Sequence, residues 1–408
     1  MTAVHVDEQL LGTYVTELGA LGETPDGMYR FMYDEAWQQA RDALLRWIDD
    51  AGLEGRVDAV GNVFGRLPGS GDGVVLTGSH VDTVPSGGKY DGALGVVGGL
   101  AALAALRAQH GTPVRTLEVV ALCEEESSRF PANFFGTRGM LGLISPDEPD
   151  RLRDRDGVLL ADAMRQAGLD PAAVASAERH DLRAFLELHI EQGRVLADEG
   201  VDVGLVEVIP GIAWETITVR GRQDHAGATP MDLRRDALQA AAQMAREITT
   251  AVEQEGRPAV VTTGRWTVEP GQPSIVPGLA RFSVDLRHPD LGVRDRLLDT
   301  VHRICATVAE RHGVEVDVVR DKDEEPATMD ADLLEVLRGS AEECGASWRR
   351  MPSGAGHDSQ LMASRVPTAM VFVPSVEGRS HTPAEYTSPA DCARGASVLA
   401  TALHRLAW

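Results

Sequence analysis

The strongest constraint on the fold is a strand–helix–strand pattern between residues 74 and 122. An apolar run at Val74–Thr77 precedes a glycine-rich loop, a small-residue apolar segment at Leu94–Gln109 and a second apolar run at Thr116–Leu122. This order predicts two parallel strands joined by a right-handed helical crossover. Because parallel strands end at the same edge of a sheet, the residues after both runs are expected to lie together, where open α/β sheets bind ligands.

The length and the order of the predicted elements indicate two domains. The chain has 408 residues, more than one ordinary core holds. Strands predicted at Ala184–Leu188 and Thr368–Val373 extend the first sheet, whereas the middle of the chain follows the β-α-β-β-α-β order of a ferredoxin-like unit. We expect an α/β domain with a mixed, largely parallel sheet flanked by helices, formed by residues 1–210 and 327–408, and an inserted α+β domain at residues 211–326. The elements predicted for the insertion are strands at Trp214–Arg220, Ala259–Val268, Ala280–Arg287 and Val314–Val319, and helices at Leu233–Glu253 and Asp295–His312.

Composition limits the compartment and the class of partner. The net charge of −23 argues against a nucleic-acid partner, since phosphate binding needs a basic face. Four scattered cysteines fit a reducing cytosol. The amino-terminal residues lack the basic and apolar regions of a signal peptide, and the apolar stretch Leu94–Leu106 is too short to span a bilayer. We therefore expect a cytoplasmic protein with no membrane partner.

Residues of types that commonly bind metals follow the strands of the predicted α/β sheet. His80 and Asp91 come after the first strand, Glu126 lies in the run CEEESSRF after the second, and His189 and His381 follow two later strands. Any one of them alone is more often a capping or packing residue, and the acidic run alone is equally typical of a solvated loop. Four strand ends that share one edge instead indicate a site for zinc, or for manganese where oxygen ligands dominate.

Five ligands exceed what one tetrahedral zinc requires, so two divalent cations are predicted. Asp91 lies on the flexible glycine-rich loop and is expected to bridge them. His80 and His189 would complete one site, and Glu126 and His381 the other. Two such cations can share an activated water and stabilise a tetrahedral intermediate.

Two further carboxylates have predicted roles beside the cations. Glu125 adjoins the ligand Glu126 and is expected to be the general base. Asp82 lies two residues after His80, and we expect its carboxylate to accept the second ring N–H of that histidine and fix its tautomer. An aspartate that only caps the turn is the alternative.

Six segments together resemble the M20-type dinuclear amidohydrolases. The closest branch contains the N-carbamoyl-L-amino-acid hydrolases, the β-ureidopropionases and the allantoate amidohydrolases, and the resemblance covers nearly the whole chain. It implies the same ligand set for two cations per subunit, Zn or Mn with Co or Ni possible, and an inserted domain that acts as a lid and in homodimerisation. The Arg129-Phe130 pair fixes how the three glutamates align with the family motif, with Glu125 as the base and Glu126 as the ligand. The segments are GSHVDTV, GGKYDGALG, EEESSRF, LELHIEQG, DHAGATPM and SHTPAEYTS.

The resemblance also implies residues that contact the substrate. In relatives the histidine that matches His225 reaches the site of the partner subunit and stabilises the oxyanion, a role worth roughly 3–4 kcal/mol. Arg287 is the implied clamp for a substrate carboxylate. Gln192, Gly356 and His357 are further implied contacts. A loop-structuring histidine and a surface salt bridge are the alternatives for His225 and Arg287.

The sequence departs from the family pattern at two positions. Ser127 stands in the acidic run where the branch has glycine, so the loop geometry there depends on whether serine adopts the backbone angles of glycine. Ser274, in PSIVPG, stands where relatives have an asparagine that contacts the substrate. A hydroxyl is shorter and offers fewer hydrogen bonds than an amide, so the usual substrate contact is in question.

These observations predict a metal-dependent hydrolase of linear amide or ureido C–N bonds. The expected substrate is a small anionic N-carbamoyl amino acid, with allantoate or β-ureidopropionate as alternatives. An aminoacylase or peptidase is less favoured, because His189 matches the amidase branch where many peptidases have a carboxylate. A binding protein without activity is the alternative from another class, against which the complete ligand set with Glu125 argues.

Overall fold

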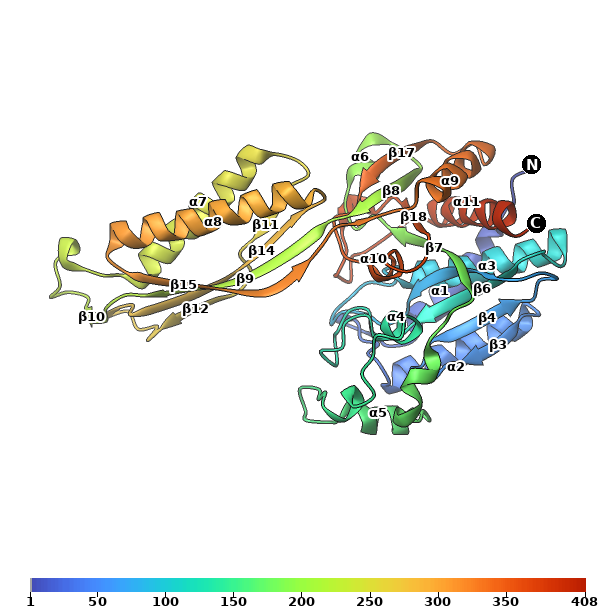
Figure 1. The fold of residues 1–408 in the computed structure, drawn as a ribbon, viewed down its shortest axis with the longest axis horizontal. Coiled ribbons are helices and arrows are strands. Elements are labelled where there is room, and N and C mark those ends of the chain that lie inside the picture. Colours follow the sequence, from blue (N-terminus) through green and yellow to red (C-terminus); the bar gives the residue numbers. More distant parts are fainter. Residues whose placement is uncertain (1) are drawn as a thin grey trace. The chain divides into compact units, whose positions relative to one another are not determined.

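The computed structural model describes residues 2–408, which form two compact units (Figure 1). Unit 1 comprises residues 2–207 together with Thr328–Trp408, and unit 2 comprises Val208–Ala327. Unit 2 is therefore an insertion in the sequence of unit 1. The lid and dimerisation roles of this insertion stay predictions.

Unit 1 is built on a mixed nine-stranded sheet with the order β16-β8-β18-β7-β5-β6-β4-β3, and β17 pairs with β8. The four central strands β18, β7, β5 and β6 are parallel, whereas β4, β3 and β8 add antiparallel neighbours. The predicted mixed sheet flanked by helices is confirmed, with parallel pairing concentrated at its centre. The strands are β3 (Glu54–Val57), β4 (Val63–Leu67), β5 (Val74–His80), β6 (Thr116–Leu122), β7 (Leu182–Ile190), β8 (Val203–Ile209), β16 (Ala327–Thr328), β17 (Trp348–Pro352) and β18 (Thr368–Val373).

Helices cover the sheet of unit 1 (Figure 1). The last helix begins as its sequence predicts, because the Ser388 hydroxyl accepts the amide of Asp391 and Pro389 occupies the first helical turn. The helices are α1 (Glu8–Ala20), α2 (Glu35–Asp50), α3 (Ala93–His110), α4 (Phe135–Met140), α5 (Leu160–Gln166), α6 (Val195–Glu199), α9 (Ala331–Glu343), α10 (Asp358–Met362) and α11 (Pro389–Ala407). Shorter elements are the hairpin β1 (Glu23–Thr24) and β2 (Gly27–Met28) and the 3-10 turns Glu148–Asp150, Pro171–Ala177 and Val376–Gly378.

Helix α3 is the crossover between β5 and β6. Among residues 2–408 it alone is long and apolar enough to cross a membrane, by length and composition. The predicted apolar stretch Leu94–Leu106 is thus part of a longer helix of 18 residues. This helix packs on β5, β6 and β7 and against α11, and 67% of it is buried. Such burial is typical of the core helix of a folded domain.

The central strands deliver their last residues to one edge of the sheet. Strand β5 runs three residues further than its apolar run, so His80 is its last residue and pairs in register with Leu122 of β6. On the other side, Phe372 of β18 is in register with His189 of β7. The loops after these strands therefore start at the same edge, as predicted.

Unit 2 contains a five-stranded antiparallel sheet, in which four strands follow the order β11-β14-β9-β15 and β12 pairs with β14. Two helices pack on it through an apolar core that includes Ile217, Met244, Phe282 and Val301. Its elements are β9 (Gly211–Arg220), β10 (Asp224–His225), a 3-10 turn (Met231–Leu233), α7 (Ala237–Glu255), β11 (Val260–Thr262), β12 (Trp266–Glu269), β13 (Ile275–Val276), β14 (Leu279–His288), α8 (Leu291–His312) and β15 (Glu315–Glu324).

Two elements of unit 2 differ from their prediction for physical reasons. The helix predicted from Leu233 starts at Ala237, because the Asp236 carboxylate caps it by accepting the amides of Leu238 and Gln239. The strand predicted at Ala259–Val268 divides into β11 and β12. Thr262 pairs with Asp285 and Trp266 with Phe282, so four residue steps face three on β14, and the extra residue interrupts the ladder.

Candidate metal centre

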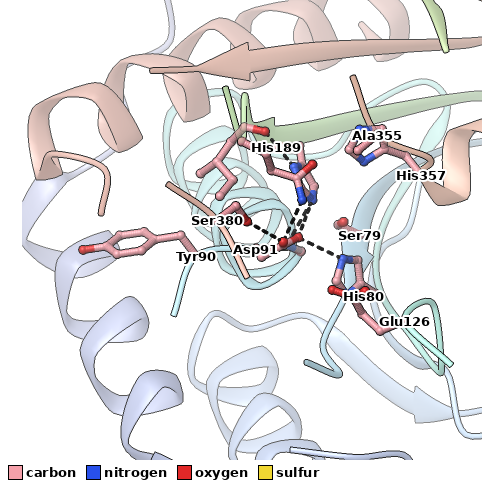
Figure 2. A network of polar contacts seen from close by, with 12 residues as sticks. Ser79, His80, Tyr90, Asp91, Glu126, His189, Ala355, His357 and Ser380 are labelled. Atoms are coloured by element: carbon pink, nitrogen blue, oxygen red, sulfur yellow. Dashed lines mark hydrogen bonds and ion pairs between the residues drawn. The ribbon is translucent and has the colours of Figure 1, made fainter. Parts of the chain in front are cut away.

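Asp91 lies at the centre of the predicted ligands (Figure 2). Its Oδ1 is 3.4 Å from His80 Nε2 and 3.1 Å from His189 Nε2. Its Oδ2 is 3.2 Å from His381 Nε2, which in turn lies 3.4 Å from Glu126 Oε1. The two oxygens of one carboxylate therefore face two different groups of side chains.

These side chains form two sets that could each hold a cation. Potential ligand atoms of His80, Asp91 and His189 lie within 4.8 Å of one another, and the same holds for Asp91, Glu126 and His381. Asp91 belongs to both sets. Imidazole with carboxylate is a donor set that divalent cations accept, so the residues present fit divalent metals.

The tautomers of two histidines support this fit. His80 Nδ1 lies 3.0 Å from the carbonyl oxygen of Asp82, and His189 Nδ1 lies 2.8 Å from the carbonyl oxygen of Ile190. Because a carbonyl only accepts, each Nδ1 must carry the proton. In the neutral rings Nε2 is then the unprotonated atom: that of His189 accepts the amide of Gly92 at 3.1 Å, and both Nε2 atoms lie within 3.4 Å of Asp91 Oδ1, an arrangement that a cation between them would stabilise.

The electrostatics of the cluster also favour positive charge. Hydrogen bonds to Asp91 and then to Glu126 raise the pKa of His381 to about 10, although burial opposes this. Burial disfavours the charged form of Asp91, but its interactions with His189, His381 and His80 outweigh this effect and hold its pKa well below the usual range.

Asp82 has a different partner from the one predicted. Its Oδ1 lies 3.8 Å from His80 Nδ1, beyond hydrogen-bond distance, and the backbone carbonyl of Asp82 orients that ring instead. The buried Asp82 carboxylate accepts the backbone amides of Glu125 and Glu126 at 3.1 and 3.0 Å. The Asp82 side chain therefore fixes the backbone of the acidic loop rather than the histidine ring.

The acidic run is not a solvated loop. Glu124 is fully buried and accepts the amides of Arg129 and Phe130 through Oε1. Burial raises the pKa of Glu125 well above its usual range, and the negative charge of Glu126 adds to this effect, while His80 opposes it. Glu125 also lies with His80 and Glu126 in a set of potential ligand atoms within 4.8 Å. A carboxylate with a raised pKa beside a metal centre can both accept and return a proton.

Ser127 adopts the backbone conformation that its glycine counterpart would supply. Its φ is 53°, in the left-handed region, and its hydroxyl hydrogen-bonds to Asn133 Oδ1. Asn133 thus gives the serine a partner that glycine would lack. Serine is therefore accommodated at position 127 in the left-handed conformation that glycine readily adopts.

Two residues with implied substrate contacts lie against the ligands themselves. Gln192 donates from Nε2 to Asp91 Oδ2 at 2.8 Å. His357 is buried, its ring centroid lies 4.6 Å from that of His189, and its Nε2 is 2.9 Å from Ser353 Oγ (Figure 2). Gly356 lies in the loop between Ser353 and His357. These contacts place Gln192 beside Asp91 and His357 beside His189.

Glu187 belongs to the same region, although sequence reasoning missed it. It is fully buried in β7 and accepts the hydroxyls of Ser79 at 2.6 Å and Ser359 at 2.5 Å. Glu187 therefore links the end of β5 to α10 by hydrogen bonds, from a position on β7 two residues before His189. A charged residue inside an otherwise apolar strand, in the segment LELHI, was the available signal.

Two of the implied contacts in unit 2 lie together. His225 is exposed in β10, and its Nδ1 accepts the amides of Gly227 and Ala228 at 3.0 and 3.2 Å. Its Nε2 must then carry the proton and can donate it. The carbonyl of Ser274 accepts the amide of Ala226 at 2.9 Å, so Ser274 adjoins His225.

Arg287 lies at the other end of the unit 2 sheet. It donates to the Asp285 carboxylate at 3.0 and 2.8 Å, which fixes the guanidinium. Leu279 marks the end of β14 that follows β13 in the chain, and eight residue steps along the strand, or about 27 Å, separate it from Arg287. One small substrate therefore cannot touch both His225 and Arg287 of the same unit 2.

Comparison with known proteins assigns the chain to a family. Residues 76–405 match the family model described as peptidase family M20/M25/M40. The chain belongs to this family. The predicted relationship and the predicted class, a hydrolase of amide-type C–N bonds, are thereby confirmed.

Similar proteins cover the whole fold of this M20 family member. It is 39% identical over 394 residues to the allantoate amidohydrolase of Escherichia coli (strain K12), with 96% of each chain covered. It is 38% identical over 397 residues to the N-carbamoyl-L-amino acid amidohydrolase of Geobacillus stearothermophilus, again with 96% of each covered. A solved hydantoinase/carbamoylase family amidase from Burkholderia ambifaria superposes with a TM-score of 0.92 at 34% identity, covering 100% of this chain and 99% of that one.

The positive φ of Ser127 leads to a test of the acidic loop. Ser127→Val should lower the free energy of unfolding by about 1–3 kcal/mol, because a β-branched residue is strained in the left-handed region. Ser127→Gly should be tolerated within about 1 kcal/mol, since glycine adopts that region freely. Denaturant unfolding measures both, with Ser128→Val as a control at a neighbouring position without positive φ. Equal stability of Ser127→Val and wild type would contradict the assigned conformation.

Proposed function

We propose that this M20 family member hydrolyses the ureido C–N bond of an N-carbamoyl-L-amino acid. The observation that carries the proposal is the convergence of His80, His189, His381 and Glu126 on the two oxygens of Asp91, with Glu125 beside them. Its products would be the amino acid, carbon dioxide and ammonia.

The proposed centre holds two divalent cations, zinc or manganese, with cobalt or nickel as accepted substitutes. His80 and His189 would bind one with Asp91 Oδ1, and Glu126 and His381 would bind the other with Asp91 Oδ2. Cations at these ligands supply Lewis acidity and lower the pKa of water.

Glu125 is the proposed proton carrier. It takes a proton from the water that attacks the ureido carbon and returns it to the leaving nitrogen. Asp82 supports this role, because its carboxylate holds the backbone amides of Glu125 and Glu126 in place. The raised pKa of Glu125 suits a group that must gain and lose a proton in each cycle.

His225 is the proposed donor to the oxyanion, acting from a second copy of the chain. Its Nδ1 accepts two backbone amides, so its Nε2–H is the group available to donate. His225 and Arg287 lie at opposite ends of unit 2, so one substrate meets both only if two copies contribute. A homodimer in which unit 2 serves as lid and dimerisation domain supplies this arrangement.

A chain of net charge −23 needs a positively charged side chain at the site in order to bind an anionic substrate. Arg287 is the proposed clamp for the substrate carboxylate, and the Asp285 carboxylate orients its guanidinium. Gln192, Gly356 and His357 line the proposed site beside the cations. Ser274 would contact the substrate through a single hydroxyl next to His225.

Allantoate is the second candidate substrate, because the identities to the two kinds of curated relative are nearly equal. The segments CEEESSRFP and SGAGHD resemble those of allantoate enzymes. The segments IPGIAW and DHAGATPMDLRRDA resemble those of the carbamoyl-amino-acid enzymes and place N-carbamoyl amino acids first. Both candidates are ureido acids and would use the same residues.

Replacing Glu125 tests the proton carrier. Glu125→Gln should bind cations as wild type does but lose about 10²–10⁴-fold in kcat, because an amide cannot accept the proton. Metal analysis and ammonia release measure the two properties on the same sample. Glu342→Gln, on the exposed side of α9, is the matched control. Near-normal turnover of Glu125→Gln would remove this residue from the mechanism.

A substrate panel tests the substrate class. The cation-loaded enzyme should release ammonia fastest from N-carbamoyl-L-amino acids when these are compared with β-ureidopropionate and allantoate. Faster release from allantoate would select the second candidate instead. Loaded enzyme that releases no ammonia from any of the three would contradict ureido hydrolysis as a whole.

A further inference from the structure

We propose that Glu385 is a positioning residue that fixes the two loops carrying the cation ligands Asp91 and His381. The inference rests on the proposed function, since it assigns Glu385 a role toward the ligands of that centre. Both carboxylate oxygens of Glu385 already accept hydrogen bonds from neighbouring residues. We therefore assign it no ligand role, and it acts through the backbone and side chains that surround it.

The first contact of Glu385 is with the backbone of the glycine-rich loop. The side chain is buried, with the residue 5% exposed. Its Oε1 accepts the amide of Tyr90 at 2.8 Å and the amide of Asp91 at 3.0 Å. The one carboxylate oxygen therefore sets the position of the residue proposed to bridge the cations.

The second contact runs through a hydroxyl. Ser380 Oγ lies 2.7 Å from Glu385 Oε2 and 2.9 Å from Asp91 Oδ2 (Figure 2). Ser380 immediately precedes His381, whose φ is 54°. The single hydroxyl proton serves one of these carboxylates at a time, so Ser380 joins Glu385 to the start of the loop that presents His381 and also lies against the Asp91 carboxylate.

The glycine-rich loop is shaped to receive this carboxylate. A Cβ at Gly88 would lie 2.2 Å from Glu385 Oε1 and 2.3 Å from its Cδ. Backbone without a side chain is thus required at Gly88 for the loop to close on Glu385. This contact gives one physical reason for glycine in the segment that leads to Asp91.

The contacts together make Glu385 a link between ligands far apart in the sequence. Asp91 and Glu385 are separated by 294 positions. Removing the link should leave each ligand present but let Asp91 Oδ2 and His381 shift relative to one another. Groups that orient ligands in this way typically change metal affinity by about 10–100-fold when they are lost.

Zinc binding by three variants of the full chain tests the proposal. Competition with a chromogenic chelator, using Zn²⁺ alone, gives affinity and stoichiometry without reference to turnover. Glu385→Ala should weaken binding by about tenfold or more. Glu385→Gln should restore it to near the wild-type value, because its Oε1 can accept both amides and its Nε2 can donate to Ser380. Asp236→Ala is the matched control, since it also removes a carboxylate that accepts two backbone amides, at the start of α7.

The outcomes separate the inference from the proposed function. Wild-type binding by Glu385→Ala, or a Gln variant as weak as the Ala variant, would overturn the positioning role. If Glu385→Ala does not fold, Ser380→Ala removes only the hydroxyl link and should weaken zinc binding in the same direction. Unchanged binding by Ser380→Ala would then overturn the role. Wild-type protein that binds no zinc or other divalent cation would instead contradict the proposed function.

Discussion

The structure of the candidate site depends on one carboxylate that faces three imidazoles. Asp91 Oδ1 lies near His80 and His189, and Oδ2 lies near His381. Two of these rings have their Nδ1 protons committed to backbone carbonyls, so their Nε2 lone pairs point inward. A cluster of carboxylates and inward lone pairs is unfavourable without positive charge, and this need for charge supports the proposed metal centre.

The parallel sheet makes this arrangement possible. Strands β5, β6, β7 and β18 end at one edge, so loops from four distant parts of the sequence meet there. The carboxylates of Asp82, Glu187 and Glu385 then brace these loops by accepting amides and hydroxyls. The candidate ligands come from the strand ends, and the three carboxylates fix the loops and strands that present them.

The sequence was sufficient to predict that the candidate ligands lie together, because the topology of the sheet, rather than the conformation of each loop, brings them to one edge. Strand ends in a parallel sheet converge whatever the loop conformation is, so His80, His189 and His381 could be grouped in advance. The hydrogen-bond partner of Asp82 could not be predicted, since it depends on the backbone angles of two residues. Glu385 could not be predicted either, because its contacts with Asp91 cross 294 positions and involve backbone amides that have no sequence signature.

In unit 2, too, the sequence pattern predicts the order of the elements but not the details of strand pairing. Its β-α-β-β-α-β order follows from apolar periodicity. The division of one predicted strand into β11 and β12 arises from a single extra residue opposite β14, which periodicity does not reveal. The distance between His225 and Arg287 follows only from strand register, and it leads to the proposal that two copies of the chain complete each site.

Anomalous X-ray diffraction from crystals grown with zinc tests the central claim most directly. Two peaks per chain are predicted, one between Asp91 Oδ1 and the rings of His80 and His189, the other between Asp91 Oδ2, Glu126 and His381. A single ion, or an ion held by Glu187, His189 and His357 instead, would contradict the account, since these three also place potential ligand atoms within 4.8 Å of one another.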